Sequence, residues 1–430
     1  MEMSAMHHPK HSDKKDSLNL NYPIIVHSHL RWDWVWQRPQ QFLSRLSKTH
    51  PILFIEGPHV VEENIEPRSV WRRLEDYPNI VVMHSEFSAA RWGAQYGAGI
   101  DVERYRLLRQ ALDGPLKDEF DYKSNRPVQW FYDPMAAPGF IGRLNERAVV
   151  YDCMDELSQF KGAPPEMIER ERLLLSHADV VFAGGRKMWK SKSRFNNNSH
   201  FYGCGVDVSH FATARDQSTP VPADVAQLSK PTLGYFGVVD ERLDYELIAK
   251  LADANANWNI CMIGPVCKVD EKDFPQRPNL HWLGGREYSA LPAYAKKFDV
   301  CLMPFAMNEA TEFINPTKAL EYMATATPVV SSPVPDVVSN LASVVQIAQT
   351  HDEFIAQCRR ALESPNLSAV ERGIKMAEEN TWEAIIAKME SHIADALTAR
   401  LATSKAKNQI APTRPIPAEV LQPTRSAAIA

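Results

Sequence analysis

The amino-acid sequence predicts an α/β protein with two doubly wound domains that face a cleft. Short apolar runs alternate with amphipathic stretches from residue 22 onward, which is typical of a parallel sheet covered by helices. A polar, proline-containing segment interrupts this pattern at residues 213–229, after which the alternation restarts. The length of 430 residues leaves room for about two to three domains.

The first predicted domain covers residues 20–212 and follows a polar segment, residues 1–19, that we expect to be disordered. Apolar runs predict its strands at residues 22–28, 51–57, 128–134, 147–156 and 179–185. Amphipathic stretches predict helices at residues 39–48 and 166–178. The aperiodic segment 213–229 is interpreted as a linker.

The second predicted domain covers residues 230–380 and repeats the alternation. Its strands are expected at residues 231–239, 258–266, 279–285, 299–305 and 328–333, and its helices at residues 245–254, 288–298 and 316–326. A last amphipathic helix follows at residues 381–403, and the Ala/Pro/Lys-rich tail, residues 404–430, is expected to be disordered. Ligands of such open sheets bind beyond the carboxyl ends of the strands, so the residues that follow strands are the site candidates.

Composition excludes several classes of protein. A formal net charge of −5 argues against a general nucleic-acid binder. The six cysteines form no Cys-x-x-Cys pair and no cluster with zinc spacing, so we expect buried, reduced thiols and no metal site. A secretory signal and a run of about eighteen apolar residues are both missing from the sequence. We therefore expect a cytoplasmic protein, with peripheral contact at the inner face of a membrane as the alternative.

Two common phosphate-binding motifs are missing. A dinucleotide fingerprint needs Gly-x-Gly-x-x-Gly, and the nearest match, at residues 203–208, has Val208 where the third glycine belongs. The lysine loop of P-loop nucleotidases is also absent from the sequence. Nicotinamide chemistry and P-loop hydrolysis thus lose their main support.

A different phosphate site is predicted at the start of the helix near residue 316. Asn315 suits the N-cap and Pro316 the first helical position, so the free N–H groups and the dipole of the helix would attract an anion. Lys318 adds a positive charge, and the Glu321 carboxylate one turn later could accept two ribose hydroxyls. The combination suits a sugar nucleotide, and a capped helix with solvated Lys318 and Glu321 is the alternative.

Two further cations follow strands of the second domain. A strand ends at Gly237, and Arg242 lies five residues later, where its guanidinium could clamp a diphosphate. The alternative is that Arg242 pairs with Asp240 or Asp244 at the surface. Lys268 follows the next strand and could direct a third positive charge toward the cleft.

Several segments resemble the group 1 glycosyltransferases of the GT-B fold. "NPTKALEYMATATPVVSSP" (315–333) resembles the family's P-x-K-x-x-E-Y-x-A-x-G-x-P-V-V segment, and "FYGCGVDVSHF" (201–211) resembles its N-G-V-D-x-x-x-F segment. "YDCMDELSQF", "HADVVFAGG", "GYFGVVDERLDYELI", "LPAYAKKFDVCLMPF" and "HLRWDWVWQRPQQFL" fit one subgroup of the family. The resemblance covers about residues 20 to 395, and it is specific because the motifs occur in this order and at this spacing.

The resemblance implies two Rossmann-like domains, with a nucleotide-diphosphate sugar held mainly by the second and an acceptor held mainly by the first. It implies that the last helix, beginning near Trp382, crosses back to the first domain. It also implies transfer with retention of configuration and without an obligatory metal, since cations and a helix N-terminus stabilise the leaving diphosphate. The donor-binding residues would be Gly237, Arg242, Lys268, Glu312, Asn315, Pro316, Thr317, Lys318 and Glu321.

The chain departs from the family pattern at one important position. The family has a pair of glutamates, of which Glu321 is the second. Phe313 stands at the place of the first, and Glu312 is one residue away. The missing asparagine and glycines, at Cys204 and Thr327 among others, are further departures. The sugar specificity of the family therefore cannot be carried over to this chain.

The first strand-to-helix loop is predicted to hold the acceptor. Trp32, Trp34 and Trp36 alternate there, and for any single tryptophan the favoured interpretation is a core position. The polar groups of a cleft-facing loop must be satisfied by neighbours or by ligand. The predicted acceptor-binding residues are Arg31, Trp32, Asp33, Gln37 and Arg38.

The predicted activity is that of a retaining glycosyltransferase of the hexosyltransferase kind, with Asp155, Arg242 and Glu321 as catalytic residues. Asp155 would contact the acceptor or the donor sugar, and the alternative is that Asp152 and Asp155 cap the next turn. The expected partners are a nucleotide sugar and a carbohydrate or lipid-linked acceptor, in polysaccharide assembly for example, and no nucleic acid. The alternative function is a GT-B-shaped nucleotide-sugar binding or partner subunit without catalysis.

Overall fold

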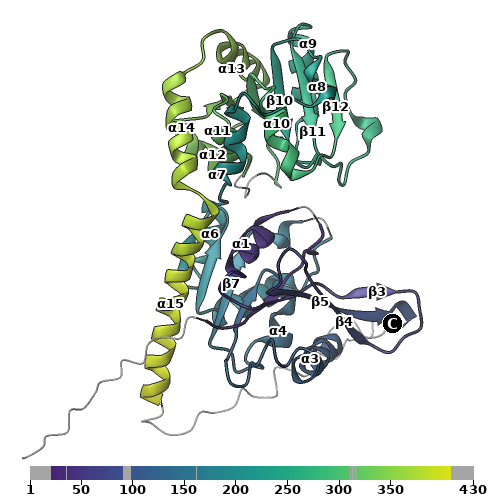
Figure 1. Ribbon diagram of the computed structural model, residues 1–430, viewed down its shortest axis with the longest axis vertical. Coiled ribbons are helices and arrows are strands. Elements are labelled where there is room, and N and C mark those ends of the chain that lie inside the picture. The colour runs from purple at the N-terminus through teal and green to yellow at the C-terminus, as the bar shows by residue number, and fades with distance from the viewer. Residues whose placement is uncertain are drawn as a thin grey trace, which may run out of the picture.

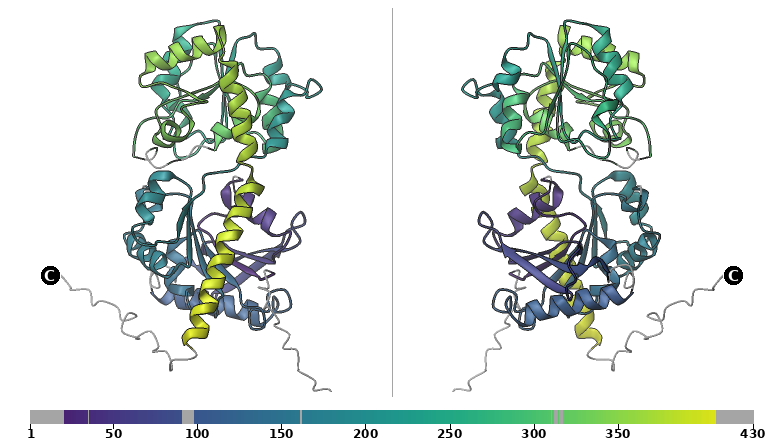
Figure 2. Two further views of the ribbon diagram at one scale, coloured as in Figure 1. Left: turned by 90° about the vertical axis from the view of Figure 1, so that its left-hand side faces the viewer. Right: turned by 90° about the vertical axis from the view of Figure 1, so that its right-hand side faces the viewer.

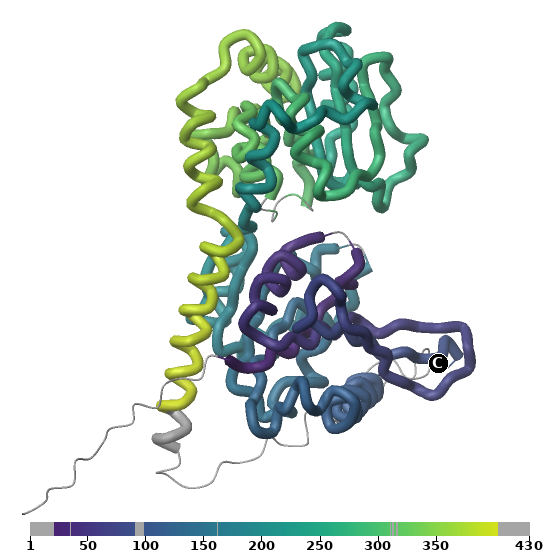
Figure 3. Tube along the Cα trace, in the orientation of Figure 1, coloured from purple at the N-terminus to yellow at the C-terminus, as the bar shows by residue number. Residues whose placement is uncertain are grey.

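The computed structural model describes residues 21–34, 36–90, 98–160, 162–309, 311, 314 and 317–407, and it consists of two α/β domains stacked along the long axis (Figure 1). The predicted fold class is confirmed. The tube in Figure 3 shows that the chain passes from the first domain to the second and returns at its C-terminal end.

The first domain is built on a mostly parallel sheet in the order β3-β5-β2-β1-β6-β7-β8-β9, with β4 paired antiparallel to β5. Its strands are β1 Ile24–His27, β2 Ile52–Ile55, β3 His59–Val61, β4 Arg68–Arg73, β5 Ile80–Ser88, β6 Val128–Phe131, β7 Ala148–Cys153, β8 Val180–Ala183 and β9 Ser199–Phe201. The strand order reverses at β1, between β2 and β6. This reversal is the place where open sheets of this kind bind ligands.

Both faces of this sheet are covered, which explains why its central strands are apolar throughout. Ile24 and Val26 pack on one face with α1 (Arg38–Leu46) and α15 (Trp382–Lys407). Ile25 packs on the other face, which is covered by α3 (Ala98–Asp113), α4 (Ala137–Phe140), α5 (Met167–His177) and α6 (Arg186–Lys192).

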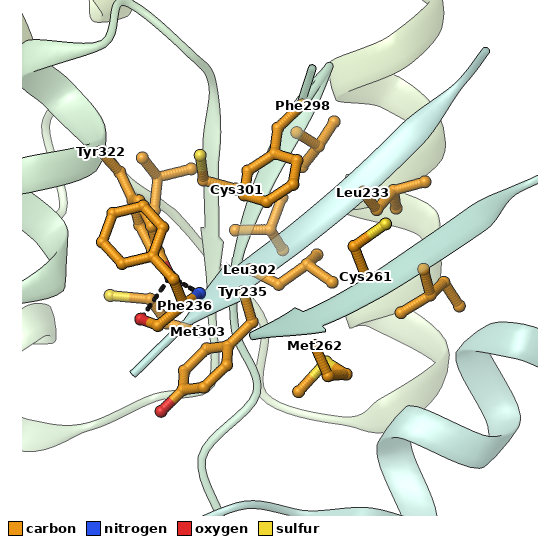
Figure 4. Close-up of a cluster of buried hydrophobic side chains, with 14 of the residues drawn as sticks. Leu233, Tyr235, Phe236, Cys261, Met262, Phe298, Cys301, Leu302, Met303 and Tyr322 are labelled. Carbon is orange, nitrogen blue, oxygen red and sulfur yellow. Dashed lines mark hydrogen bonds between the residues drawn. The ribbon is translucent and has the colours of Figure 1, made fainter. Parts of the chain in front are cut away.

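The second domain has a parallel sheet in the order β12-β11-β10-β13-β14-β15. Its strands are β10 Thr232–Phe236, β11 Asn259–Ile263, β12 Leu280–Gly284, β13 Val300–Met303, β14 Val329–Ser331 and β15 Gln346–Ile347. Figure 4 shows the apolar core at the centre of this sheet, where the Tyr322 hydroxyl accepts from the Phe236 backbone N–H at 3.0 Å. This bond connects α11 (Lys318–Ala324) to the end of β10.

Helices enclose the second sheet. They are α7 Val208–Ala212, α8 Ala223–Ala226, α9 Tyr245–Ala254, α10 Leu291–Ala295, α11, α12 Pro335–Leu341, α13 His351–Glu363 and α14 Leu367–Glu379. The segment predicted as a linker, 213–229, contains α8 and a short 3-10 helix, Thr213–Arg215. Its side chains Ala214 and Val225 are buried in the core of the second domain. Two apolar side chains in a polar segment were too weak a pattern to predict this packing.

The structure also adds an extension that the sequence did not predict, in which β4 pairs antiparallel and β3 pairs parallel with β5. Strands β3, β4 and β5 project from the side of the first domain (Figure 3). β4 has the sequence RSVWRR, and none of its residues is buried. A strand without a buried apolar face carries little of the alternation on which the sequence analysis depends. Of the helices that the structure describes, none combines the length and apolar character needed to cross a bilayer.

Helix α15 returns to the first domain, as the resemblance implied. Figures 1 and 2 show α14 beside the second domain and α15 running along the first. The buried apolar stripe of α15 consists of Trp382, Ile385, Ile386, Met389, Ile393, Ala396 and Leu397. Burying each large side chain of this kind contributes about 1.5–3 kcal/mol, so α15 is an integral part of the first domain.

The chain crosses between the domains twice at one place, where Gly205 packs on the start of α15. A Cβ atom at Gly205 would lie 2.7 Å from the backbone nitrogen of Trp382 and 2.8 Å from its Cα. Both atoms belong to the backbone, which cannot turn aside as a flexible side chain can.

We therefore expect Gly205→Ala to destabilise the protein by about 1–3 kcal/mol, the usual cost of forcing an extra carbon into a packed site. The measurement is the midpoint of urea unfolding followed by tryptophan fluorescence. Gly57→Ala is the matched control, because a Cβ there would meet nothing within 4 Å. Equal midpoints for the two variants would show that the crossing is not tightly packed.

Candidate functional site at the domain junction

Charged side chains from both domains meet where the domains face each other, and we call this region the domain junction. The Lys268 Nζ atom of the second domain lies 4.9 Å from the ring centre of Phe160 of the first. The Arg186 backbone N–H donates to Asp336 Oδ2 at 2.9 Å, also across the domains. The junction comprises Arg38, Asp155, Phe160, Arg186 and Cys204 of the first domain and Arg242, Lys268, Thr317, Lys318 and Asp336 of the second.

Asp155 is the carboxylate at the centre of this charge arrangement. It follows β7 and is half-buried. Burial raises the pKa of its carboxyl, and the nearby positive charges of His29, Arg242, Arg38 and Lys268 act to lower it. One carboxylate of the first domain thus lies among cations from both domains, so Asp155 and Arg242, both predicted as site residues, are brought together.

His29 lies beside the junction and was not predicted as a site residue. Its Nδ1 atom lies 3.2 Å from the backbone oxygen of Tyr132, and its imidazole is close enough to Asp155 to affect the pKa of that carboxyl. The available signal was its position directly after the first strand, in the same loop as the predicted acceptor residues. The tryptophans and arginines that follow it were the more conspicuous residue types.

Arg242 is held in one orientation by Asp240. Arg242 Nε donates to Asp240 Oδ1 at 2.9 Å and Nη2 donates to Oδ2 at 2.6 Å. Burial lowers the pKa of the guanidinium, but the bonds to Asp240 raise it above its ordinary value, so the group stays charged. The pairing considered as the alternative is therefore present. The Arg242 side chain is nevertheless 35% exposed, and this exposed part can meet a ligand.

The loops after β10 and β11 pack backbone to backbone. Gly237 and Gly264 have φ angles of +155° and +159°, and a Cβ atom at Gly264 would lie 1.6 Å from the Gly237 carbonyl oxygen. A Cβ atom at Gly237 would also lie 2.8 Å from the Cε atom of Lys318. Glycine is therefore required at these positions, and it allows Lys318 to lie directly over the end of β10.

Glu321 carries a buried carboxylate with an unused acceptor. It is 6% exposed, and within the described part of the chain its Oε2 atom has no hydrogen-bond partner. Lys318 Nζ lies 3.5 Å from this oxygen. Buried polar atoms are normally hydrogen-bonded, so an unused carboxylate oxygen is typical of a ligand site. The predicted donor residues Glu312, Asn315 and Pro316 lie outside the described residues. The predicted start of the helix is wrong by two residues, because α11 begins at Lys318 with Thr317 as its N-cap.

Cys204 lies near charged or polar residues of both domains. The pKa of its thiol is raised by burial, and Arg38 of its own domain and Thr317 and Lys318 of the other domain act to lower it. Four of the six cysteines are buried, whereas Cys204 and Cys267 are partly exposed. The expectation of buried thiols is thus wrong for Cys204 and Cys267. Cys204 is partly exposed because it lies at the domain junction rather than in either core.

The predicted acceptor residues divide into two groups. Arg38 is buried: its Nε donates to both Asp152 oxygens at 3.0 and 3.1 Å, and its Nη1 donates to the backbone oxygens of Tyr202 and Gly203 at 2.8 and 3.0 Å. Asp152 is therefore an ion-pair partner and not a cap of the next turn. Trp32 is also buried, 5% exposed, with its ring edge-on to Phe54.

Arg31 and Asp33 lie instead on a separate cavity of about 330 Å³, together with Trp34, Glu56, His59, Val70, Trp71, Arg72, Val82 and His84. Asp33 Oδ2 accepts from Arg72 Nη2 at 2.5 Å. Gln37 precedes α1, where its backbone N–H donates to Gln40 Oε1 at 3.1 Å. The structure therefore does not bring the five predicted acceptor residues to one surface, and their acceptor role stays a prediction.

A comparison with known protein families finds a match for the second domain. Residues 230–364 match the family model of the glycosyl transferases group 1. This match lies wholly within the second domain. The matched region contains Gly237, Arg242, Lys268, Thr317, Lys318 and Glu321.

A similar relative covers more of the chain. TuaH of Bacillus subtilis (strain 168), named for a proposed role as a glycosyltransferase in teichuronic acid biosynthesis, is 23% identical over 58% of this chain and 67% of its own length.

Solved structures share the whole two-domain architecture. The solved structure described as "Trehalose-6-phosphate from E. coli bound with UDP-2-fluoro glucose" superposes with a TM-score of 0.61 at 16% sequence identity. The match covers 87% of this chain and 99% of the other chain. The structure of sucrose-phosphate synthase from Thermosynechococcus elongatus superposes with a TM-score of 0.64 at 14% sequence identity. The match covers 88% of this chain and 100% of the synthase chain. At these identities the likeness establishes the GT-B fold alone.

The buried Arg38–Asp152 pair generates a prediction about stability. We expect Asp152→Ala to lower the free energy of unfolding by about 3–5 kcal/mol, because it leaves the Arg38 charge buried without its partner. The measurement is urea denaturation at neutral pH.

Asp253→Ala is the matched control. Asp253 pairs with Arg277 at 2.5 Å on the surface, where its side chain is 53% exposed. Such a surface pair contributes about 0–1 kcal/mol. A loss for Asp152→Ala no larger than that for Asp253→Ala would contradict the structural role of the buried pair.

Proposed function

We propose that the protein is a retaining glycosyltransferase that moves a sugar from a nucleotide-diphosphate sugar to a glycan, lipid-linked or other small acceptor. The observation that carries this proposal is the gathering of Arg242, Lys268 and Lys318 after three strands of a domain that matches the glycosyl transferases group 1, beside Asp155 of the other domain. Cations held there before the substrate arrives suit a ligand with a diphosphate group.

The donor diphosphate would be held by the second domain. As the glycosidic bond breaks, negative charge develops on the leaving phosphate, and fixed positive groups stabilise that charge without having to reorganise. The bonds from Asp240 fix Arg242, and the absence of a side chain at Gly237 gives Lys318 access to the same region. The start of α11, at Thr317 and Lys318, would add the N–H groups of a helix N-terminus.

The nucleoside would be recognised by Glu321. The unused Oε2 atom of this buried carboxylate can accept a ribose hydroxyl, which would satisfy it. The solved relative bound with UDP-2-fluoro glucose supports a nucleotide sugar as the donor class. Glu312 is assigned to the donor sugar.

The acceptor would be held by the first domain. Asp155 is assigned to a polar contact with the transferred sugar or the acceptor, and the loop residues Arg31, Asp33 and Gln37 to the acceptor side. We assign no general base, because in a retaining reaction the leaving phosphate can take the acceptor proton. No obligatory metal is proposed for the transfer.

The similar proteins support a proposal for the biosynthetic process in which the reaction takes part. The name of TuaH supports a role in polysaccharide assembly. A location in the cytoplasm, with peripheral contact to the inner face of a membrane, would suit a lipid-linked acceptor.

We expect Arg242→Ala to reduce transfer, or hydrolysis of the nucleotide sugar, by about 100-fold or more, the usual effect of removing one group that stabilises developing charge. Glu321→Ala should reduce both nucleotide affinity and turnover by about 10-fold or more, because the ribose hydroxyl loses a charged acceptor. Turnover is measured as released nucleotide, and affinity for the nucleotide by isothermal titration calorimetry. Arg277→Ala is the matched control, since this exposed arginine pairs with Asp253 away from the junction.

Wild-type turnover and affinity in both variants would show that the site is elsewhere. Nucleotide binding by the wild-type chain without hydrolysis, or transfer to any acceptor offered, would favour the alternative of a binding or partner subunit.

A further inference from the structure

Three potential metal ligands converge in the first domain, away from the domain junction. Glu56 follows β2 directly, His59 begins β3 and His84 lies in β5. β5 pairs with both β2 and β3, so the sheet brings these residues together. Each offers one ligand atom, and the three atoms lie within 4.8 Å of one another. An ion placed between them could therefore reach all three.

The geometry of the Glu56 carboxylate is fixed before any ion binds. Its Oε1 atom accepts from the backbone N–H of Trp32 at 2.9 Å, and its Oε2 atom lies 3.3 Å from His59 Nε2. The Glu56 side chain is 6% exposed. A hydrogen bond to the second oxygen of a carboxylate is the kind of support that orients metal ligands.

The two imidazoles are also held in place. The rings of His59 and His84 are stacked, with centroids 3.8 Å apart and planes inclined by 16°. The His59 Nε2 atom is buried, and among the described residues it has no hydrogen-bond partner. A buried ring nitrogen that makes no hydrogen bond and lies 3.3 Å from a buried carboxylate is an arrangement that a bound cation would complete.

We propose that Glu56, His59 and His84 bind a divalent transition-metal ion, with Zn²⁺ as the best match. Two imidazoles and one carboxylate are a common ligand set for zinc, and hard ions such as Mg²⁺ prefer oxygen ligands alone. Three protein ligands leave a coordination position open.

The open position faces the cavity described above, because all three ligand residues line it. Arg31 and Arg72 lie on the same cavity, and Arg72 is paired with Asp33. A carboxylate or phosphate oxygen entering the cavity would meet the ion and these guanidinium groups together. The site therefore suits an anionic ligand. Arg31 and Asp33, assigned above to the acceptor side, line the same cavity, but Zn²⁺ binding itself requires neither nucleotide nor sugar transfer.

No metal site was expected from the sequence, because its Cys and His residues do not show the close spacing that is typical of zinc sites. Here the carboxylate precedes the first histidine by three residues, and the second histidine lies two strands further along the chain. Only the pairing of β5 with both β2 and β3 brings the three residues together.

The test is a titration of the full chain with Zn²⁺ alone, in the absence of nucleotide. Binding is measured by isothermal titration calorimetry and by the shift in melting temperature. His7, His8 and His11 are replaced by alanine in every protein compared, because these N-terminal histidines could bind Zn²⁺ by themselves. We expect one equivalent of Zn²⁺ to bind and to raise the melting temperature. His59→Ala and His84→Ala should each weaken binding by about tenfold or more.

Glu56→Gln is the variant least disturbing to the fold, since its amide oxygen can still accept from the Trp32 N–H, and it should also weaken binding. His200→Ala is the matched control. His200 also stacks on another histidine, His392, with ring centroids 3.6 Å apart. Within the described part of the chain, however, this pair is not part of a cluster of three potential metal ligands. The proposal is overturned if Zn²⁺ does not bind, or if Glu56→Gln and His200→Ala bind it equally.

Discussion

The buried ion pair between Arg38 and Asp152 is the interaction on which the domain junction depends. It joins the start of α1 to the end of β7, and through the Arg38 bonds to the Tyr202 and Gly203 carbonyls it also fixes the chain that leads into Cys204 and Gly205. Asp155 follows Asp152 by three residues, so its place among the cations depends on this anchor. Fully buried charges are costly unless they are paired and hydrogen-bonded. Here Arg38 Nε donates to both Asp152 oxygens and Nη1 donates to two backbone carbonyls, and the bonds to Asp152 anchor the end of β7, three residues before Asp155.

The charges of the junction are divided unequally between the domains. The second domain supplies Arg242, Lys268 and Lys318, whereas Asp155, the carboxylate whose pKa the charges of Arg242 and Lys268 act to lower, comes from the first. A diphosphate would therefore be attracted by the second domain, and the first would supply polar contacts to the sugar. Because α15 returns to pack on the first domain, the double crossing at Gly205 and Trp382 connects the two halves of the site.

The sequence predicted the fold well because buried parallel strands are apolar throughout and are easily recognised. It predicted Arg242 and Asp155 as site residues because each follows a strand, and Lys318 because it lies at the start of a helix. It could not distinguish Arg38, whose guanidinium is satisfied inside the protein, from Arg31, which lines a cavity, since both are arginines in one loop. It missed His29, the extension formed by β3, β4 and β5 and the Glu56–His59–His84 group, because these depend on which strands pair and not on local spacing.

The central claim is that the second domain binds a nucleoside diphosphate through the cations of the junction. The most direct measurement is the melting temperature of the wild-type chain titrated with UDP, GDP, ADP and their sugars. A ligand at about 100 times its dissociation constant adds about 2.7 kcal/mol to the free energy of unfolding. The account predicts that at least one of these nucleotides raises the melting temperature in a concentration-dependent and saturable way. No shift with any of the nucleotides or nucleotide sugars would contradict it.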